Sequence, residues 1–162
     1  MEERLRILDQ QIAQLTSTSV DQKTRALLET LPGFGPINGA KILAGLPNEI
    51  LLSGNNRKVS ARLQAFMDND PRLRQSGKWK GITKMSKRGV EMLRTAFFQS
   101  ASSAAEHDPE LRAYYQRKRA QGKKHRVAIS HLMRILTRRL VAVLCSGKPY
   151  SSHYNLTLQN AA

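Results

Sequence analysis

Helical spacing of apolar residues is the feature that most constrains how this chain folds. Five apolar residues in the range 126–145 lie at spacings of three and four residues, apart from one adjacent pair: Leu132, Ile135, Leu136, Leu140 and Val143. This spacing places their side chains on one face of an α-helix, where they can pack against a core. No stretch of the chain alternates convincingly with the two-residue period of a half-buried strand. We therefore expect an all-α fold.

Prolines, glycines and short polar stretches mark where the expected helices end. Asp21 and Ser86 are the expected N-caps of two helices, because a short oxygen-bearing side chain can accept a hydrogen bond from a free backbone N–H group. Asp68-Asn69-Asp70-Pro71 is expected to end another helix, since the residue before a proline is disfavoured in helices. The ranges predicted to be helical are 1–16, 21–31, 36–46, 58–67, 86–105, 107–120 and 126–145.

The segment Leu31-Pro-Gly33-Phe-Gly35-Pro36 joins two of these helices. Its glycines permit a tight turn, and the pattern over about 21–46 resembles a helix-hairpin-helix motif. Gly33 and Gly35 are candidate DNA-binding residues, because N–H groups exposed at the start of the next helix can hold a phosphate without reading a base sequence. Gly39 and Ala40 are expected to let the two helices pack closely. The alternative is a structural turn without a DNA contact.

The charge of the chain is strongly positive and unevenly distributed. The 162 residues contain 27 Lys and Arg against 12 Asp and Glu, a formal net charge of +15. The range 71–126 holds 15 basic and 4 acidic residues, a net charge of +11, and this clustering favours a nucleic acid as partner over a merely solvated surface. Arg126, Ser130, Arg134 and Arg138 repeat every four residues along one helix face. Arg134 and Arg138 are candidate phosphate contacts, with a solvated face as the alternative.

One serine, Ser76, lies on a Ser-Gly step inside a basic run at 72–89 that contains no acidic residue. The cations of this run are candidate DNA-binding residues: Arg72, Arg74, Lys78, Lys80, Lys84, Lys87 and Arg88. We expect a glycine-rich basic loop that grips a phosphodiester, with Ser76 as the attacking nucleophile. A serine hydroxyl is weak unless a base activates it or cations stabilise the developing charge. The nearby cations can stabilise the developing charge, but no residue evidently acts as the base.

Several other classes of site find no support in the sequence. Cys145 is the single cysteine, which excludes an internal disulfide and a thiolate zinc site. Neither the acidic residues nor the four histidines show the spacing of metal ligands, so we expect no metal or cofactor bound by this chain. A signal-like N-terminus and an apolar run of about 18 residues are both lacking, which predicts a cytoplasmic protein without a membrane partner.

The range 1–19 is predicted to be the end of a coiled-coil linker helix. Within Met1–Thr16, four apolar residues fall at the a and d positions of a heptad: Leu5, Leu8, Ile12 and Leu15. This pattern suits a contact between two chains, hence a homo-oligomer, and equally suits packing on the same domain. We expect the main domain over 20–150 and a flexible tail over 151–162.

With these residues in hand, the range 24–150 resembles the C-terminal domain of transposases of the insertion-sequence 110 family, whose relatives include site-specific DNA invertases. The segments that carry the resemblance are Leu-Pro-Gly-Phe-Gly at 31–35, Ser-Gly-Lys-Trp-Lys-Gly at 76–81, Ser-Lys-Arg-Gly at 86–89, the Asp-Pro to Tyr-Tyr-Gln-Arg stretch at 108–117 and Gly-Lys-Lys at 122–124. The order Ser-Gly-Lys-Trp is the most specific of them.

The resemblance implies that Ser76 is the nucleophile of DNA transposition, forming a 5′-phosphoserine link and releasing a 3′-hydroxyl. It implies strand exchange directed by a bridge RNA, and a partner RNase H-like domain whose acidic residues hold Mg²⁺. That domain is missing from this sequence, so we expect a fragment that is inactive alone. Asp68-Asn69 stands where relatives usually have Gly-Leu, which places negative charge before the basic loop. The alternative function is a non-catalytic helix-hairpin-helix module that binds DNA.

Overall fold

The fold is described from a computed structural model, which defines residues 22–47, 55–69, 71–72, 75–76, 79–80, 84–85 and 89–151. For the residues between 71 and 85, the backbone of four short strands is what is described. The predicted helix Met1–Thr16, the expected cap Asp21 and the predicted tail beyond Ser151 lie outside the described residues.

The described part is built around helices, which confirms the predicted all-α class. The helices are α2 (Gln22–Glu29), α3 (Pro36–Gly45), α5 (Asn56–Phe66), α6 (Glu91–His107), α7 (Pro109–Ala120) and α8 (His125–Ser146). Two-residue strands lie between α5 and α6: β1 (Pro71–Arg72), β2 (Gln75–Ser76), β3 (Trp79–Lys80) and β4 (Lys84–Met85). None of the described helices combines the length and apolar composition that crossing a bilayer requires.

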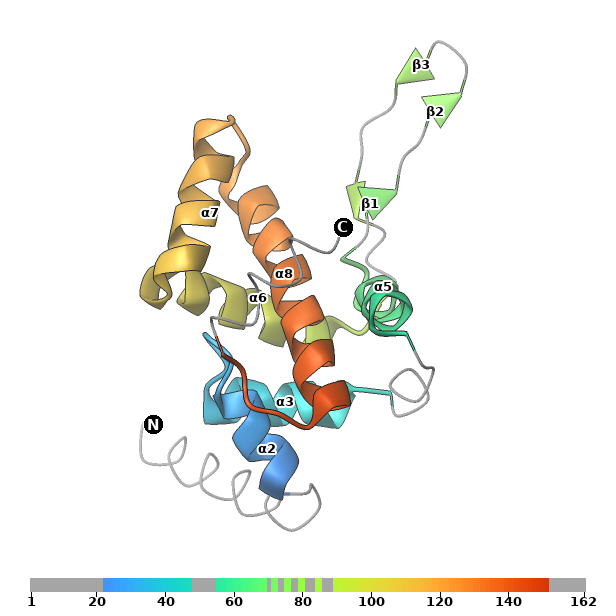
Figure 1. The fold of residues 1–162 in the computed structure, drawn as a ribbon. Coiled ribbons are helices and arrows are strands. Elements are labelled where there is room, and N and C mark those ends of the chain that lie inside the picture. Colours follow the sequence, from blue (N-terminus) through green and yellow to red (C-terminus); the bar gives the residue numbers. More distant parts are fainter. Residues whose placement is uncertain are drawn as a thin grey trace, which may run out of the picture.

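Helices α6 and α8 form the centre of the fold. Helix α6 packs against α3, α7 and α8, while α8 also packs against α5 and α2 (Figure 1). The α8 stripe is buried as predicted at Leu132, Leu136, Leu140 and Val143, and Ile135 is partly buried. On α6, the fully buried Phe97 meets Phe34 edge to face, with ring centroids 5.8 Å apart.

Local capping explains where several helices begin and end. The Asp108 carboxylate accepts a hydrogen bond from the Leu111 N–H at 2.8 Å, and Pro109 occupies the first turn of α7. Asn55 caps α5 in the same manner, accepting from the Arg57 N–H at 2.9 Å. Gly147 ends α8 in the left-handed conformation, with φ 63°.

The prediction that Ser86 caps α6 is wrong. Helix α6 begins at Glu91, and its N-cap is Val90, which makes no side-chain capping bond. The reason is that β4 pairs with β1, so the chain is still extended at Met85. The segment predicted as a basic loop therefore contains two antiparallel strand pairs.

The turn between α2 and α3 has a packing role that the sequence did not indicate. Gly33 adopts φ +79°, and a Cβ atom placed on it would overlap the carbonyl oxygen of Ser100 on α6. Glycine is therefore required by both conformation and contact. At Gly39, in contrast, a Cβ atom would meet nothing within 4 Å. Gly39 and Ala40 are nevertheless both buried in α3, and α2 packs against α3, so the role of these two small residues in that packing stays a prediction.

Replacing Gly33 by Ala should destabilise the fold by about 3 kcal/mol, since the new methyl group adds a steric overlap to backbone strain. Gly122→Ala is the matched control, because Gly122 has φ +77° but open space around its Cβ position. The control substitution should lower the free energy of unfolding by about 1 kcal/mol. Urea denaturation of the three proteins measures both losses. Equal losses would show that the contact with α6 contributes nothing.

Candidate nucleic-acid interface

The strands between α5 and α6 pair to form a hairpin. In the β1–β4 pair, Pro71 lies opposite Met85, and in the β2–β3 pair Ser76 lies opposite Trp79. Ser76 is thus the last residue of β2, next to the connection between the two inner strands. Strands β2 and β3 lie farther from the helices than β1 does (Figure 1). The predicted nucleophile therefore belongs to a projecting element.

The hairpin leaves the helices through a tightly packed root, which we define as residues 66–69 and 89–90. A Cβ atom on Gly89 would lie 2.5 Å from the Phe66 carbonyl oxygen, so the two sides of the root are in direct contact. The Val90 N–H donates to the same Phe66 oxygen at 3.2 Å. Arg94 of α6 donates to the Met67 carbonyl at 3.4 Å. These contacts join the end of α5 to the start of α6.

The root is also bonded to α8 through Asn69, which is only 3% exposed. The Ser130 hydroxyl donates to Asn69 Oδ1 at 2.8 Å, and Asn69 Nδ2 donates to the Ser130 carbonyl at 3.3 Å. Its neighbour Asp68 is also buried and adopts φ +57°, a conformation that favours glycine.

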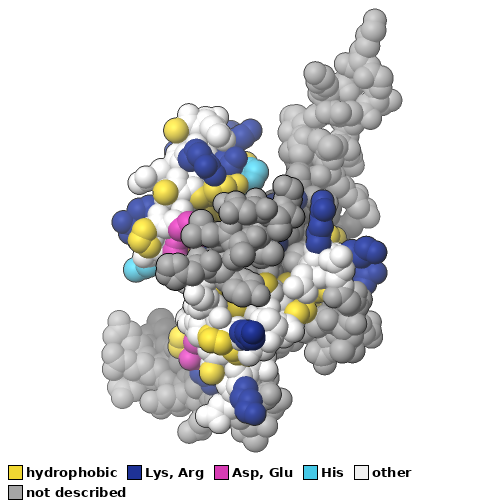
Figure 2. All heavy atoms as spheres, viewed as in Figure 1, with side chains coloured by type: hydrophobic (Ala, Val, Ile, Leu, Met, Phe, Trp, Pro, Cys, Tyr) yellow, Lys and Arg dark blue, Asp and Glu magenta, His cyan; other side chains and the backbone are white. Residues whose placement is uncertain are grey.

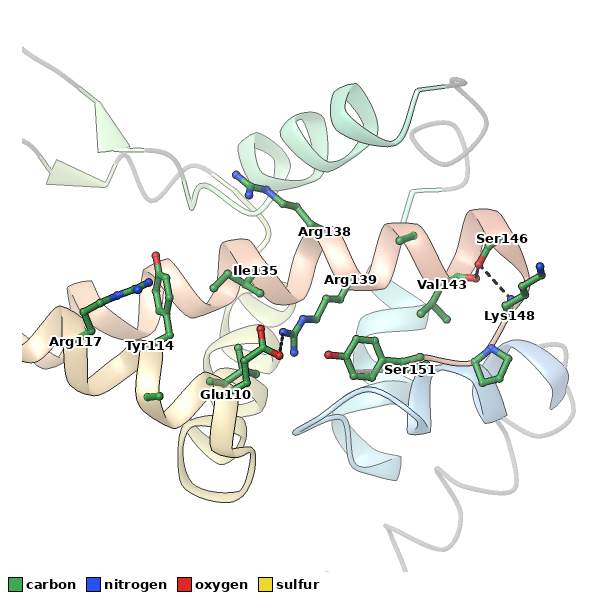
Figure 3. Close-up of a pocket in the computed structure, with 15 residues that line it drawn as sticks. Glu110, Tyr114, Arg117, Ile135, Arg138, Arg139, Val143, Ser146, Lys148 and Ser151 are labelled. Carbon is green, nitrogen blue, oxygen red and sulfur yellow. Dashed lines mark hydrogen bonds and ion pairs between the residues drawn. The ribbon is translucent and has the colours of Figure 1, made fainter. Parts of the chain in front are cut away.

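Ser130 lies in the middle of the basic helix face that the sequence predicted. Arg126 and Arg138 on this face are exposed, and Arg134 is half-buried. Figure 3 shows Arg138 extending from α8 toward α5, away from the neighbouring Arg139. Because Ser130 contacts Asn69, the face that carries these arginines also meets the root of the hairpin.

Helices α5 and α7 add further cations. Arg57, Lys58 and Arg62 are exposed on α5, which packs against α8. In Figure 2, Lys and Arg side chains gather over α5 and over α7, with few acidic side chains among them. Burial lowers the pKa of His131 on α8, and the charges of Lys118, Arg134 and Lys123 lower this pKa further. The imidazole is therefore neutral at neutral pH and stands in a positive electrostatic environment.

A cavity of about 1010 Å³ lies between α7, α8 and the segment after α8. Its lining includes Arg139, which is 5% exposed and forms an ion pair with Glu110 at 2.7 Å (Figure 3). The Arg139 guanidinium also lies 4.9 Å from the centroid of the Tyr150 ring. The Tyr150 N–H donates to the Thr30 hydroxyl oxygen of the α2–α3 turn at 2.9 Å. These bonds fix the segment after α8 to the body and give Arg139 a structural role.

The predicted DNA-binding residues fall into three groups. Arg134 and Arg138 lie on one face, as expected, beside the hairpin root. Gly33 packs on α6, whereas Gly35 is exposed at the N-cap of α3. The remaining members are Arg72, Lys80 and Lys84, whose backbones form strands, and Arg74, Lys78, Lys87 and Arg88, which lie outside the described residues.

Sequence reasoning did not identify the contacts that hold the hairpin. The sequence indicates Asn69 only as a helix-ending residue and Ser130 only as a member of a basic face. Their pairing joins positions 61 residues apart, a separation that leaves no local signal. In the described residues, no group of three or more His, Cys, Asp or Glu side chains could hold a metal ion.

Comparison with known proteins relates the chain to mobile elements. Residues 25–116 match the family described as transposase IS116/IS110/IS902. The chain is 31% identical over 136 residues to the insertion element IS900 uncharacterized 42 kDa protein of Mycobacterium paratuberculosis, covering 84% of this chain and 32% of that protein. It is 29% identical, with the same coverage, to the insertion element IS110 uncharacterized 43.6 kDa protein of Streptomyces coelicolor. The chain thus spans about one third of the length of these relatives.

The basic face of α8 generates a prediction about binding to duplex DNA. If about six phosphates are contacted, the affinity should fall on the order of a thousandfold between 50 and 200 mM salt. Arg134→Ala and Arg138→Ala should each weaken binding equally on unrelated sequences and reduce the salt slope by about one. Lys148→Ala is the control, because Lys148 is exposed but follows the far end of α8. Fluorescence anisotropy titrations measure these effects, and an affinity independent of salt would contradict the prediction.

Proposed function

Because the chain belongs to the IS116/IS110/IS902 transposase family, we propose that it is the DNA-binding, serine-bearing part of a transposase and acts in DNA transposition. The observation that carries this proposal is the position of Ser76 at the end of β2, in a basic hairpin whose root is bonded to α8. A phosphodiester that reaches Ser76 would lie among cations of the same segment. The resemblance to insertion-sequence 110 transposases is itself confirmed by the family match.

In the proposed reaction, Ser76 Oγ attacks a backbone phosphorus of DNA. A bond forms between the serine oxygen and phosphorus, and the bond from phosphorus to the 3′-oxygen breaks. The products are a 5′-phosphoserine link and a free 3′-hydroxyl, which receives a proton, while the serine hydroxyl loses its own proton to a base. Arg72, Arg74, Lys78 and Lys80 are the cations proposed to offset the charge that develops on the phosphoryl oxygens.

The proposal requires a second domain that supplies carboxylates. The described residues do not fit a Mg²⁺ site, since they contain no cluster of three possible ligands. We therefore propose that an RNase H-like domain of the full-length transposase is a partner, with Mg²⁺ bound there and not by this chain. A bridge RNA that directs the exchange is the second proposed partner. The curated relatives are about three times as long as the matched region, which leaves ample length for such a domain.

A non-catalytic DNA-binding module remains the competing function. The helix, turn and helix expected over 21–46 correspond to α2, the turn at Gly33 and α3. Gly35, at the exposed start of α3, would offer backbone N–H groups to a phosphate. Both functions predict DNA binding, but the competing one gives the Ser76 hydroxyl no role beyond affinity.

Substitution of Ser76 separates the two functions. We expect the chain alone to bind DNA and barely cleave it, and the chain with the RNase H-like domain, Mg²⁺ and bridge RNA to form a covalent adduct. Ser76→Ala should abolish the adduct, while DNA affinity changes by at most about 1 kcal/mol, the contribution of one hydrogen bond. A denaturing gel of end-labelled DNA measures adduct formation.

Ser86→Ala is the matched control, because Ser86 is a second serine in the same basic segment. This variant should form the adduct at the rate of the unsubstituted protein. Loss of the adduct in Ser86→Ala together with its retention in Ser76→Ala would contradict the assignment. Equal adduct formation by all three proteins would do so as well.

We also propose that two copies of the chain associate weakly through Met1–Thr16. Two heptads provide a narrow apolar seam that forms only a marginal coiled coil. Leu8→Asp should remove self-association in sedimentation velocity at high protein concentration, because the carboxylate would be buried in that seam. Gln11→Asp, which adds the same charge outside the a and d positions, is the control. Identical monomeric sedimentation of all three proteins would contradict the proposal.

A further inference from the structure

Among the described residues, the hairpin joins the helical body at its root, and the contacts of the root include a buried polar pair. We infer that Asn69 and Ser130 are positioning residues, which set the direction of the Ser76 hairpin relative to the arginine face of α8. For its consequence in catalysis the inference rests on the proposed function of Ser76. Its physical part, the orientation of the hairpin, can be tested without any reaction.

The geometry of the pair supports a positioning role. Each of the two residues both donates and accepts, since the Ser130 hydroxyl donates to Asn69 Oδ1 and Asn69 Nδ2 donates to the Ser130 carbonyl. Two bonds of 2.8 and 3.3 Å hold the amide group at two points and so restrict its rotation as well as its distance. Asn69 is 3% exposed, so water cannot readily replace the bonds when they break.

The other contacts of the root perform a different task. The bond from Val90 to Phe66 and the bond from Arg94 to Met67 join α5 to α6, and thereby close the two sides of the hairpin on each other. Neither bond connects the hairpin to α8. The Asn69–Ser130 pair connects the hairpin root to α8, because Ser130 belongs to that helix. Ser130 lies between Arg126 and Arg134 along the same helix face.

A small rotation at the root is magnified along the hairpin. Extended chain advances about 3.3 Å per residue, so Ser76 can stand about 20 Å from Asn69, and a tilt of about 10° would move it by about 3 Å. A misplacement of about 1 Å can slow a positioned reaction by a factor on the order of a hundred. The two hydrogen bonds are therefore expected to affect chemistry at Ser76 more than they affect the stability of the fold.

The first arm of the test measures orientation in the protein alone. Asn69→Ala, Ser130→Ala and the double variant are compared with the unsubstituted chain. Trp79 is the single tryptophan and lies in β3 opposite Ser76, so its fluorescence anisotropy reports the hairpin. We expect each single variant to lower this anisotropy and to speed hydrogen exchange of the Asn69-position and Val90 amides about tenfold, the effect of losing roughly one buried hydrogen bond. Amides in α7 should exchange as before.

Coupling and rescue distinguish a specific pair from general loosening. The double variant should be no worse than Asn69→Ala, which removes both bonds, whereas Ser130→Ala removes only the hydroxyl bond and keeps the backbone carbonyl that accepts from Asn69 Nδ2. Ser130→Thr keeps the hydroxyl and should behave as the unsubstituted chain does. Additive effects in the double variant, unchanged anisotropy in the single variants, or failure of Ser130→Thr to preserve the amide protection would each overturn the inference.

The second arm places the same substitutions in the complete transposase with DNA, bridge RNA and Mg²⁺. Adduct formation should slow at least tenfold in Asn69→Ala, while the dissociation constant for DNA stays within about threefold, because binding does not need the exact hairpin direction. Adduct rates that follow DNA affinity would overturn the inference. If the unsubstituted transposase forms no adduct, the proposed function fails, and the inference about orientation is then decided by the first arm.

Discussion

Packing of α8 against both α5 and α6 is the constraint on which the rest of the structure depends. Helix α5 ends at Phe66 and α6 begins at Glu91, and both lie against the same central helix. The chain between them must therefore leave and return at nearly the same point, which an antiparallel hairpin achieves. Gly89 permits the two sides to meet, because any side chain there would collide with the end of α5. The apolar stripe of α8 thus determines where the Ser76 hairpin is rooted.

The same helix organises the charges. Its apolar stripe is buried in the core, while a second face carries Arg126, Arg134 and Arg138 beside the hairpin root. Arg139, the residue after Arg138, is instead buried and forms an ion pair with Glu110. One helix therefore separates a structural arginine from arginines that are available to a polyanion. The distribution suits a phosphate-rich partner, and it agrees with a chain whose +15 net charge is carried largely by one region.

Local signals explain which parts of the fold could be predicted. The helices predicted over 107–120, from a break and a proline at its start, and over 126–145, from apolar spacing, are both observed as α7 and α8. The strands could not be predicted, because two-residue strands show no alternation. The prediction that Ser86 caps a helix failed because β4 pairs with β1 and so keeps the chain extended as far as Met85. The Asn69–Ser130 pair was likewise inaccessible, since its members meet only after α5 has packed on α8. Candidate site residues could thus be identified from composition, but their arrangement required the tertiary structure.

The central claim is that the hairpin presents Ser76 to DNA as the attacking group. The most direct measurement is mass spectrometry of the trapped protein–DNA adduct formed by the complete transposase, after digestion with trypsin and nuclease. The account predicts a nucleotide joined through its 5′-phosphate to the peptide Gln75–Lys78, which contains Ser76 and no other hydroxyl side chain. A nucleotide attached to any other peptide, or joined through a 3′-phosphate, would contradict it.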